Sequence, residues 1–553
     1  MKLKQTFLAG IFVLVILSNG FSQRIDGTNT AYEEGDWISY TQCRHVNSIQ
    51  AAHDLIYVAT EGGILRYDFY AHEWLFPFTI SNGLPDNYIL AVAFDVATNL
   101  LWCSTREAVS VYDRGSHIWQ NYYLDELRMA GNDPVLSFGF EKAGVWLETG
   151  SGKHYFSPLN QTTFTEVSGD PDKSVVWFGA RGFTPGHLDY YFLPNSLMFI
   201  EDAHSYSIQD TNLRNFGLDY YLVDPWQTIW VGTNGLGMFT ADTRIRQMKP
   251  LPYGLLNPDV HAMAKNNREF WIGGIQQESD RSGVTDWNLR SKQWKYFEPR
   301  YISRFRNDKI KAIAIQDNTI WFGTCDGLIR YRTDKNSWRS LTVFDGLQDN
   351  KIYTLAQQDT LLYVGSNDGL DLITEFTQKS DSLVISPVTK PKDRVSVYDI
   401  YIDDNLVWAG TGYGLYVYDR MKNEGGYYRG ADGPGVEPVF AVDRLRDSLW
   451  VATLHTVEVY DLKNEIWRGS PARKLFPETK IFDLVTSDGA VWVGTDDGLY
   501  KHHVHKGYWK QFTRRDGLLH PRVQKLLVDG DYLWIGSPQG LTRFYWNSPF
   551  RID

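Results

Sequence analysis

Short runs of apolar residues alternate with polar, glycine-containing turns along almost the whole chain, and one pattern of about twelve residues keeps returning. Its clearest copies read IWVGTNGLGMFT at 229–240, IWFGTCDGLIRY at 320–331, VWAGTGYGLYVY at 407–418 and VWVGTDDGLYKH at 491–502. Apolar residues alternate with others on both sides of the central turn, which is typical of strands in sheets packed face to face. The pattern therefore predicts repeated β-hairpins.

An aromatic residue marks each copy, and neighbouring markers are mostly 42–45 residues apart. These anchors are Tyr57, Trp102, Trp146, Trp230, Trp271, Trp321, Tyr363, Trp408, Trp450, Trp492 and Trp534. The step from Trp146 to Trp230 is double, so we expect a degenerate copy between them, around Tyr190 and Tyr191. Repeats of this period with short strands indicate β-propeller blades.

Each repeat is expected to supply four strands, as the eleventh illustrates. Its strands are predicted at 480–486, 491–494, 498–503 and 508–512. The second and third are joined by the turn at 495–498, where Gly498 supplies the positive φ that a tight hairpin needs. The predicted fold class is therefore all-β, a β-propeller of about twelve four-stranded blades.

The two ends of the chain are expected to meet. The last repeat lacks its fourth strand, and the segment 36–41 resembles 507–513 of the repeat before it. We predict that the N-terminal strand at 37–41 completes the C-terminal blade and so hides a sheet edge. Since rings usually hold about four to eight blades, two rings are expected, six plus six being one division, with domains at 23–305 and 306–553. A closing N-terminal strand would instead require the chain to leave one ring, build the other and return.

The first 22 residues predict a signal peptide, with Lys2 and Lys4 before an apolar run and small residues before Gln23. We therefore expect an exported chain, periplasmic, secreted or at the cell surface, with no membrane insertion after cleavage. Removing the two lysines changes the formal net charge from −11 to −13. This acidic balance argues against nucleic acid and anionic lipid as partners.

Three cysteines, Cys43, Cys103 and Cys325, show no zinc-binding spacing and cannot all pair with one another. We interpret them as half-buried small residues, with one bridge from Cys43 to either of the others as an alternative. Most of the 20 tryptophans fall in the anchor position or 17 residues after it, which indicates packing between blades. Four lie outside both positions and are better candidates for exposed platforms: Trp177, Trp226, Trp287 and Trp546.

The phrase W-[VIF]-G-T-x-x-G-L-x-x-[YF] resembles the two-component-regulator propeller repeat. A second element of that repeat, a D/N-G-L turn after the fourth strand, is present at 78–87, 341–350 and 512–520. In that family the repeats form paired propellers in the periplasmic sensor region of bacterial hybrid receptors, which typically sense oligosaccharides, and the same repeat resembles a propeller subunit of a bacterial surface-secretion system. The resemblance covers nearly the whole chain after residue 22 and is weakest at 146–215. It implies a binding propeller, here expected without the receptors' kinase and DNA-binding segments.

Strand direction alternates within a blade. The turns between second and third strands therefore open on the same face as the loops that enter each blade, and the candidate binding residues come from this face. Turns and loops also use Asn, Asp and Gly for purely conformational reasons. A mouth lined with amides, carboxylates and aromatic groups nevertheless suits a polar ligand. The candidates are Arg106, Asn234, Asp326, Asn350, Tyr413 and Asp496.

No catalytic motif is found, since nucleophile elbows, P-loops and HExxH are absent. His503 and His505 share a strand face but have no identifiable third ligand, so neither a metal nor a cofactor is expected. The leading hypothesis is an exported, non-enzymatic propeller that binds an oligosaccharide or a cell-envelope protein. The alternatives are a protein-binding scaffold of envelope or secretion assembly, and a carbohydrate-active lyase or hydrolase.

Overall fold

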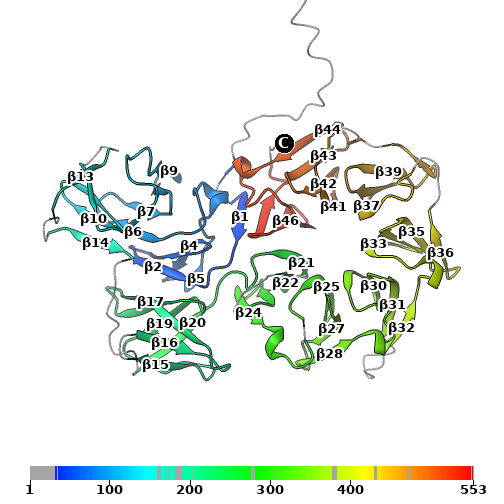
Figure 1. Ribbon diagram of the computed structural model, residues 1–553, viewed down its shortest axis with the longest axis horizontal. Coiled ribbons are helices and arrows are strands. Elements are labelled where there is room, and N and C mark those ends of the chain that lie inside the picture. The colour runs from blue at the N-terminus through cyan, green and yellow to red at the C-terminus, as the bar shows by residue number, and fades with distance from the viewer. Residues whose placement is uncertain are drawn as a thin grey trace, which may run out of the picture.

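The computed structural model describes residues 32–549 and 551, apart from 34, 159–162, 170, 172–173, 181–187, 189, 203–204, 276–280, 306, 376–382, 429–432, 470, 473–474 and 477. The predicted signal peptide at 1–22 lies outside this part of the chain. The described residues form eleven antiparallel β-sheets (Figure 1). Within them, no helix is long and apolar enough to cross a lipid bilayer. The predicted all-β class is confirmed.

Seven sheets follow one another around a closed circle, which we call the seven-sheet ring. Their strands are β21 (Val260–Lys265), β22 (Glu269–Gly274), β23 (Val284–Asn288) and β24 (Gln293–Phe297); β25 (Ile310–Gln316), β26 (Thr319–Thr324), β27 (Gly327–Arg332) and β28 (Ser337–Leu341); β29 (Ile352–Gln358), β30 (Leu361–Ser366), β31 (Gly369–Glu375) and β32 (Leu383–Pro387); β33 (Val397–Asp403), β34 (Leu406–Thr411), β35 (Gly414–Asp419) and β36 (Glu424–Tyr427); β37 (Val439–Leu445), β38 (Ser448–Thr453), β39 (Val457–Asp461) and β40 (Ile466–Trp467); β41 (Ile481–Ser487), β42 (Ala490–Thr495), β43 (Gly498–His503) and β44 (Tyr508–Phe512); and β45 (Lys525–Asp529), β46 (Tyr532–Ser537) and β47 (Gly540–Tyr545) with β1 (Trp37–Tyr40).

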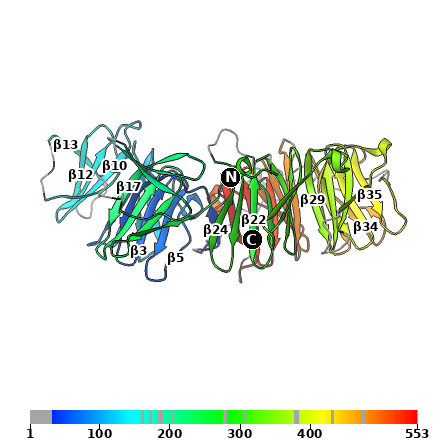
Figure 2. The same ribbon diagram turned by 90° about the horizontal axis from the view of Figure 1, so that it is seen from below.

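The other four sheets, the four-sheet group, lie beside the ring in the same flat layer (Figure 2). Their strands are β2 (Val46–Ala51), β3 (Leu55–Thr60), β4 (Gly63–Asp68) and β5 (Glu73–Trp74); β6 (Ala91–Asp95), β7 (Leu100–Ser104), β8 (Ala108–Asp113) and β9 (Ile118–Tyr123); β10 (Val135–Glu141), β11 (Gly144–Thr149), β12 (His154–Pro158), β13 (Thr165–Val167) and β14 (Val176–Gly179); and β15 (Met198–Asp202), β16 (Ser205–Gln209), β17 (Asn215–Val223), β18 (Thr228–Thr233), β19 (Met238–Asp242) and β20 (Gln247–Leu251). Five short 3-10 turns lie in loops between these sheets or between sheets of the ring: η1 (Ile80–Asn82), η2 (Pro299–Tyr301), η3 (Val343–Asp345), η4 (Pro391–Asp393) and η5 (Arg514–Asp516).

In the clearest copies of the twelve-residue repeat, a threonine and a glycine shape the central hairpin. In β42–β43, Thr495 Oγ1 donates to the carbonyl oxygen of Gly498 at 2.8 Å. Gly498 has a φ of +128°, and a Cβ there would lie 2.7 Å from the carbonyl oxygen of Phe512. The second glycine of the phrase therefore satisfies both a left-handed turn and a close approach of the neighbouring strand, as the sequence predicted for the turn.

The first glycine of the phrase lies where neighbouring sheets meet. A Cβ on Gly536 in the last sheet would lie 2.9 Å from Val260 Cγ1 in β21, so the last sheet packs on β21 and closes the ring. A Cβ on Gly232 in β18 would lie 2.3 Å from Val46 Cγ1 in β2, so this sheet packs on the first sheet of its own group. These glycines allow neighbouring sheets to pack without a gap.

The predicted closing strand is confirmed. β1 pairs antiparallel with β47, with Trp37 opposite Phe544 and Tyr40 opposite Leu541. The indole of Trp37 stacks on the ring of Phe544 at 3.9 Å and an interplanar angle of 11°. The chain therefore begins in the seven-sheet ring, leaves it to build the four-sheet group, and returns to finish the ring.

The predicted division into domains at 305–306 and the even division of blades are not what the sheets show. The boundary falls between β24 and β25, whose sheets contact each other inside the ring. The last sheet packs on β21, so the sheet β21–β24 belongs to the ring with the C-terminal sheets. The chain crosses between the ring and the four-sheet group at 41–45 and 252–259, and not at 305–306.

The predicted twelfth repeat forms no separate sheet among the described residues. Strands β15 and β16, which follow Tyr190 and Tyr191, extend the edge of β17 to give a six-stranded sheet. Similarly, β14 adds to the inner edge of β10 and makes a five-stranded sheet. The degenerate part of the sequence thus adds strands to existing sheets.

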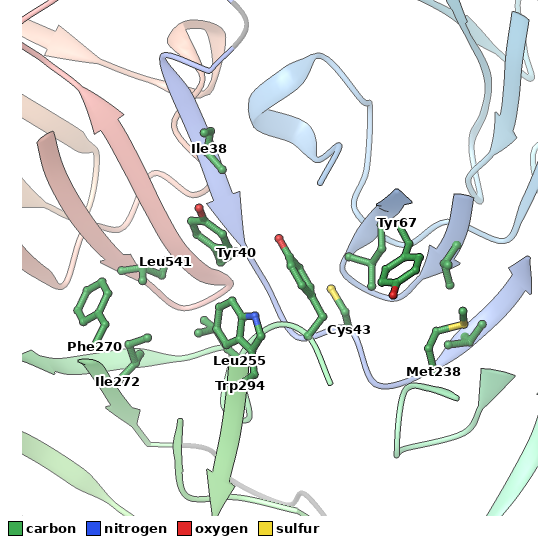
Figure 3. Packing of buried hydrophobic residues seen from close by; sticks show 14 of the residues in the cluster. Ile38, Tyr40, Cys43, Tyr67, Met238, Leu255, Phe270, Ile272, Trp294 and Leu541 are labelled. Carbon is green, nitrogen blue, oxygen red and sulfur yellow. The ribbon is translucent and has the colours of Figure 1, made fainter. Parts of the chain in front are cut away.

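The two crossing segments run side by side and fill the junction between ring and group. The amide of Leu255 donates to the carbonyl oxygen of Thr41 at 2.8 Å, and Gln42 and Gly254 form an antiparallel bridge. Around them lies one apolar cluster with residues from both parts, including Ile38, Tyr40, Cys43, Tyr67, Met238, Leu255 and Trp294 (Figure 3). All three cysteines are free thiols, and Cys43 and Cys103 are buried. The junction is therefore a packed core and not a flexible linker.

Candidate functional site

Three of the predicted ligand-binding residues lie in turns and loops of the seven-sheet ring, and two of them hold these segments together. A side-chain oxygen of Asp496 accepts the N–H of Lys480 at 2.9 Å. Asn350 accepts the N–H of Val343 with its side chain at 2.9 Å and the N–H of Gly327 with its carbonyl at 2.6 Å. Asp326 is an exposed residue of the neighbouring turn. The structure therefore brings Asp326 and Asn350 together and places Asp496 elsewhere on the ring.

The other three lie on separate sheets. Tyr413 is 44% exposed and contacts Tyr427 edge-on at 5.5 Å. The guanidinium of Arg106 lies 5.1 Å over the ring of Tyr88 in the four-sheet group. Asn234 contacts His45 at the junction and lines a pocket there. The six predicted residues thus share a face but are not gathered into one site.

The inner strands of the ring carry an aromatic arc on this face that the sequence did not indicate. Its members are Tyr353, Tyr398, Phe440 and Phe482, each the second residue of its inner strand, where the strand register shifts by a β-bulge. Tyr398 lies 5.6 Å from Tyr353 and 5.1 Å from Phe440, and basic side chains flank the two ends of the arc. A bulge re-aims a side chain, which explains why simple strand alternation missed the arc.

A second aromatic site, the junction cleft, opens on the other face, where first and second strands and third and fourth strands turn. It has a volume of about 540 Å³ and draws on both parts of the molecule. Its aromatic lining comes from Tyr40, Trp74, Phe76, Tyr253, Trp287, Trp294, Tyr532 and Trp534. The size lies within the range of about 300–1,000 Å³ that is typical of small-molecule sites.

The rings of the junction cleft are held at fixed orientations. Trp287 and Trp294 face each other across β23–β24 and stack at 4.6 Å with an angle of 7°. Tyr40 lies 4.8 Å from Trp287 and 6.1 Å from Trp534, and Trp74 lies 5.3 Å from Tyr253. Four of the rings are at most 7% exposed and support the cleft from beneath: Tyr40, Tyr253, Trp294 and Trp534. The aromatic surface that a ligand can reach therefore comes from Trp74, Phe76, Trp287 and Tyr532, and the packed rings beneath limit how far it must be ordered on binding.

Charged groups surround this aromatic surface. Lys292 Nζ and Glu73 Oε2 pair at 2.6 Å and link the ring to the four-sheet group, while Lys265 Nζ and Asp529 Oδ2 pair at 2.9 Å. The guanidinium of Arg543 lies over the rings of Phe76 and Tyr532, at 5.1 and 4.7 Å. Burial raises the pKa of Tyr40 to about 12, so its phenol stays protonated at neutral pH. The cleft thus combines aromatic faces with polar groups able to bind hydroxyls.

Of the four tryptophans predicted as exposed platforms, Trp287 lines the junction cleft. Trp226 is 41% exposed and packs beside Phe69 at 4.3 Å, whereas Trp546 is only 8% exposed because it packs on Trp492 at 5.9 Å. Trp177 is half-buried. No three side chains of His, Cys, Asp or Glu gather in a metal-binding arrangement within the part of the chain that the structure describes.

Comparison with known proteins agrees with this architecture. No protein-family model matches the chain. A curated relative, "Histidine kinase P4" of Formosa agariphila, is 21% identical over 333 residues, which are 57% of this chain and 21% of the relative. The chain therefore spans about a fifth of the length of that curated relative.

Among solved structures, the extracellular domain of the hybrid two-component system BT3049 from B. thetaiotaomicron is 15% identical, with 94% of this chain and 76% of that chain covered and a TM-score of 0.44. PorZ, a surface component of the type-IX secretion system of Porphyromonas gingivalis, is 13% identical, with 92% of this chain and 87% of that chain covered and a TM-score of 0.57. At such identities the likeness to PorZ shows a shared fold. The curated relative is described as a histidine kinase, which agrees with the resemblance to two-component sensor proteins that the repeat predicted.

Proposed function

We propose that the chain is an exported protein that binds an oligosaccharide in the junction cleft and leaves it chemically unchanged. One observation carries the proposal, which is the set of fixed aromatic rings flanked by charged side chains at the cleft. A sugar ring offers C–H groups on one face and hydroxyls at its edge, and these two surfaces match the aromatic rings and the charged groups of the cleft.

Two further findings support this function. Trp287 lines the cleft although it lies outside the packing positions of the repeat, as expected for a tryptophan with a role beyond blade packing. The similar solved structure PorZ is described as a bacterial surface component of a secretion system, and this description fits a protein that acts outside the cytoplasm.

The test is calorimetric titration of the full exported chain with a panel of neutral oligosaccharides. We expect Trp287→Ala to weaken saccharide binding about tenfold or more, because an aromatic contact contributes about 0.5–1.5 kcal/mol beyond its buried area. Trp226→Ala is the matched control, because Trp226 is an exposed tryptophan outside the cleft. Trp287→Phe keeps an aromatic ring and should retain most of the binding.

Three outcomes would overturn the proposal. If the exported chain binds no saccharide but captures a cell-envelope protein, the alternative of a protein-binding scaffold replaces it. If saccharide binding is unchanged in a folded Trp287→Ala variant, the cleft is not the site. If chromatography of the incubated saccharide shows new products, the chain is an enzyme.

A further inference from the structure

A second pocket at the junction lies on the opposite face from the cleft, among the loops that include Asn234. We call it the arginine pocket, and its volume is about 840 Å³. Four arginines and a histidine line it: Arg44, Arg214, Arg281, Arg300 and His45. Among the described residues, no carboxylate lines the pocket. A concentration of cations without lining acids is unusual in a chain whose formal net charge is −11.

Acidic residues behind the lining hold two of the arginines in place. Glu298 Oε2 pairs with Arg214 Nη1 at 2.8 Å, and Glu298 Oε1 pairs with Arg281 Nε at 2.9 Å. Asp210 Oδ2 binds Arg214 Nη2 at 2.7 Å. Because these side chains are already ordered, a ligand would not have to restrict their rotation on binding.

The other arginines place further positive charge around the same space. Arg44 is only 6% exposed, and burial together with the nearby Arg281 lowers its pKa to about 10. Arg300 is exposed and lies next to Tyr301. Arg44 and Arg281 repel each other, an effect that Glu61 and Glu298 only partly offset, and an anion bound beside them would relieve that repulsion.

The remaining lining groups suit hydroxyls and a flat carbon skeleton. Asn212, Asn215, Asn234 and Gln42 supply amides. Phe216 and Tyr301 supply aromatic faces, and the guanidinium of Arg214 lies 5.5 Å over the first and 4.9 Å over the second. The volume lies within the range of about 300–1,000 Å³ typical of small-molecule ligands, which is more than a single oxyanion requires.

We propose that the arginine pocket binds a carboxylate, sulfate or phosphate group, and that a saccharide carries this group. The arginines pair with the anion through charge-assisted hydrogen bonds, and the amides bind the hydroxyls of the sugar ring. This site is separate from the junction cleft and does not depend on the function proposed there.

The experiment titrates the full exported chain, at constant ionic strength, with inorganic sulfate, inorganic phosphate, a uronic-acid disaccharide, a sulfated disaccharide and a neutral disaccharide. We expect the anionic disaccharides to bind more tightly than the inorganic anions, and the neutral one not to bind this pocket. Arg300→Gln should weaken anion binding at least fivefold, because it removes an exposed lining cation without opening the core. Arg281→Gln should weaken it further.

Arg515→Gln is the matched control, because Arg515 is exposed and outside the pocket. Absence of binding by every anion, or unchanged affinity in both pocket variants, would overturn the proposal. Inorganic anions that bind as tightly as the disaccharides would support the anion site and overturn the saccharide part. Trp287→Ala should leave anion binding intact, so a failure at the cleft and a failure at this pocket can be told apart.

Discussion

The seven-sheet ring and the four-sheet group grow from the same repeat but differ in how neighbouring inner strands are joined. In the ring, carboxylates of Asp399, Asp443 and Asp483 accept the backbone N–H of Val442, Thr486 and Leu526 on the next inner strand, at 2.7–2.9 Å. In the group, the hydroxyl of Ser48 accepts the N–H of Val92 at 2.8 Å in the equivalent way. The contact is the same, but at these three joins the ring makes it with carboxylates.

This difference shows what regular repetition provides. In the ring, each sheet meets the next through equivalent residues, so its last sheet can close on its first. In the group, the sheets β10–β14 and β15–β20 take extra strands, and the regular succession ends. The ring is therefore expected to be the more cooperative part, whose stability depends on closure and on buried charges.

The largest effect is expected from breaking the closure. Trp37→Ala should lower the free energy of unfolding by about 3–5 kcal/mol, because Trp37 is 2% exposed and fills the contact between β1 and β47. Thermal and urea unfolding of the variant measure this. Trp226→Ala, which removes a 41% exposed indole from the four-sheet group, should cost much less. Equal losses in the two variants would contradict a special role for ring closure.

A smaller effect is expected from removing one charged contact between inner strands. Asp483→Ala should cost about 3 kcal/mol, because it leaves Lys525 Nζ, 3.0 Å from Asp483 Oδ2, without this counter-ion. Ser48→Ala in the group should cost about 1–2 kcal/mol, since a neutral hydrogen bond is lost. Urea unfolding compares the two. A larger loss for Ser48→Ala would show that the charged contacts do not distinguish the ring.

The smallest effect concerns pH. Burial, followed by repulsion from Asp483, raises the pKa of Asp399 to about 6, although Lys525 acts in the opposite direction. A raised carboxyl pKa means that protonated Asp399 favours the folded state, so its contribution is present below about pH 4 and is lost as pH rises to about 6. Asp399→Asn keeps an acceptor for Val442 but cannot ionise. Its melting temperature relative to the natural chain should therefore rise by a few degrees between pH 4 and pH 7, and a constant difference across this range would contradict the assignment.

Much of the fold was predictable because the same residue types occupy the same strand and turn positions in successive repeats. Trp492 and Gly498 mark a strand and a turn by residue type alone, and the similarity of 36–41 to 507–513 identified the closing strand. The grouping into seven and four sheets was not predictable, because Gly232 and Gly536 stand in the same phrase yet contact different sheets. Which sheet a glycine meets is decided by the path of the chain and not by the phrase.

The candidate sites were predictable only in part. Trp287 stood out by position, but Trp74, Trp294 and Trp534 belong to the regular packing positions and line the junction cleft only because two parts of the chain meet there. The arginine pocket draws on Arg44, Arg214, Arg281 and Arg300, which no local pattern connects. Of the six predicted binding residues, Asn234 lines a junction pocket.

The pairing of β1 with β47 has a consequence for how the protein is made. The hydroxyls of Ser39 and Thr542 hydrogen-bond at 2.8 Å although 503 positions separate them. β1 therefore leaves the ribosome long before its partner β47 is made, and non-local pairing of this kind is slow. Until then two unpaired strand edges stay open to aggregation, so production of this protein should depend on a chaperone that shields its N-terminal strand.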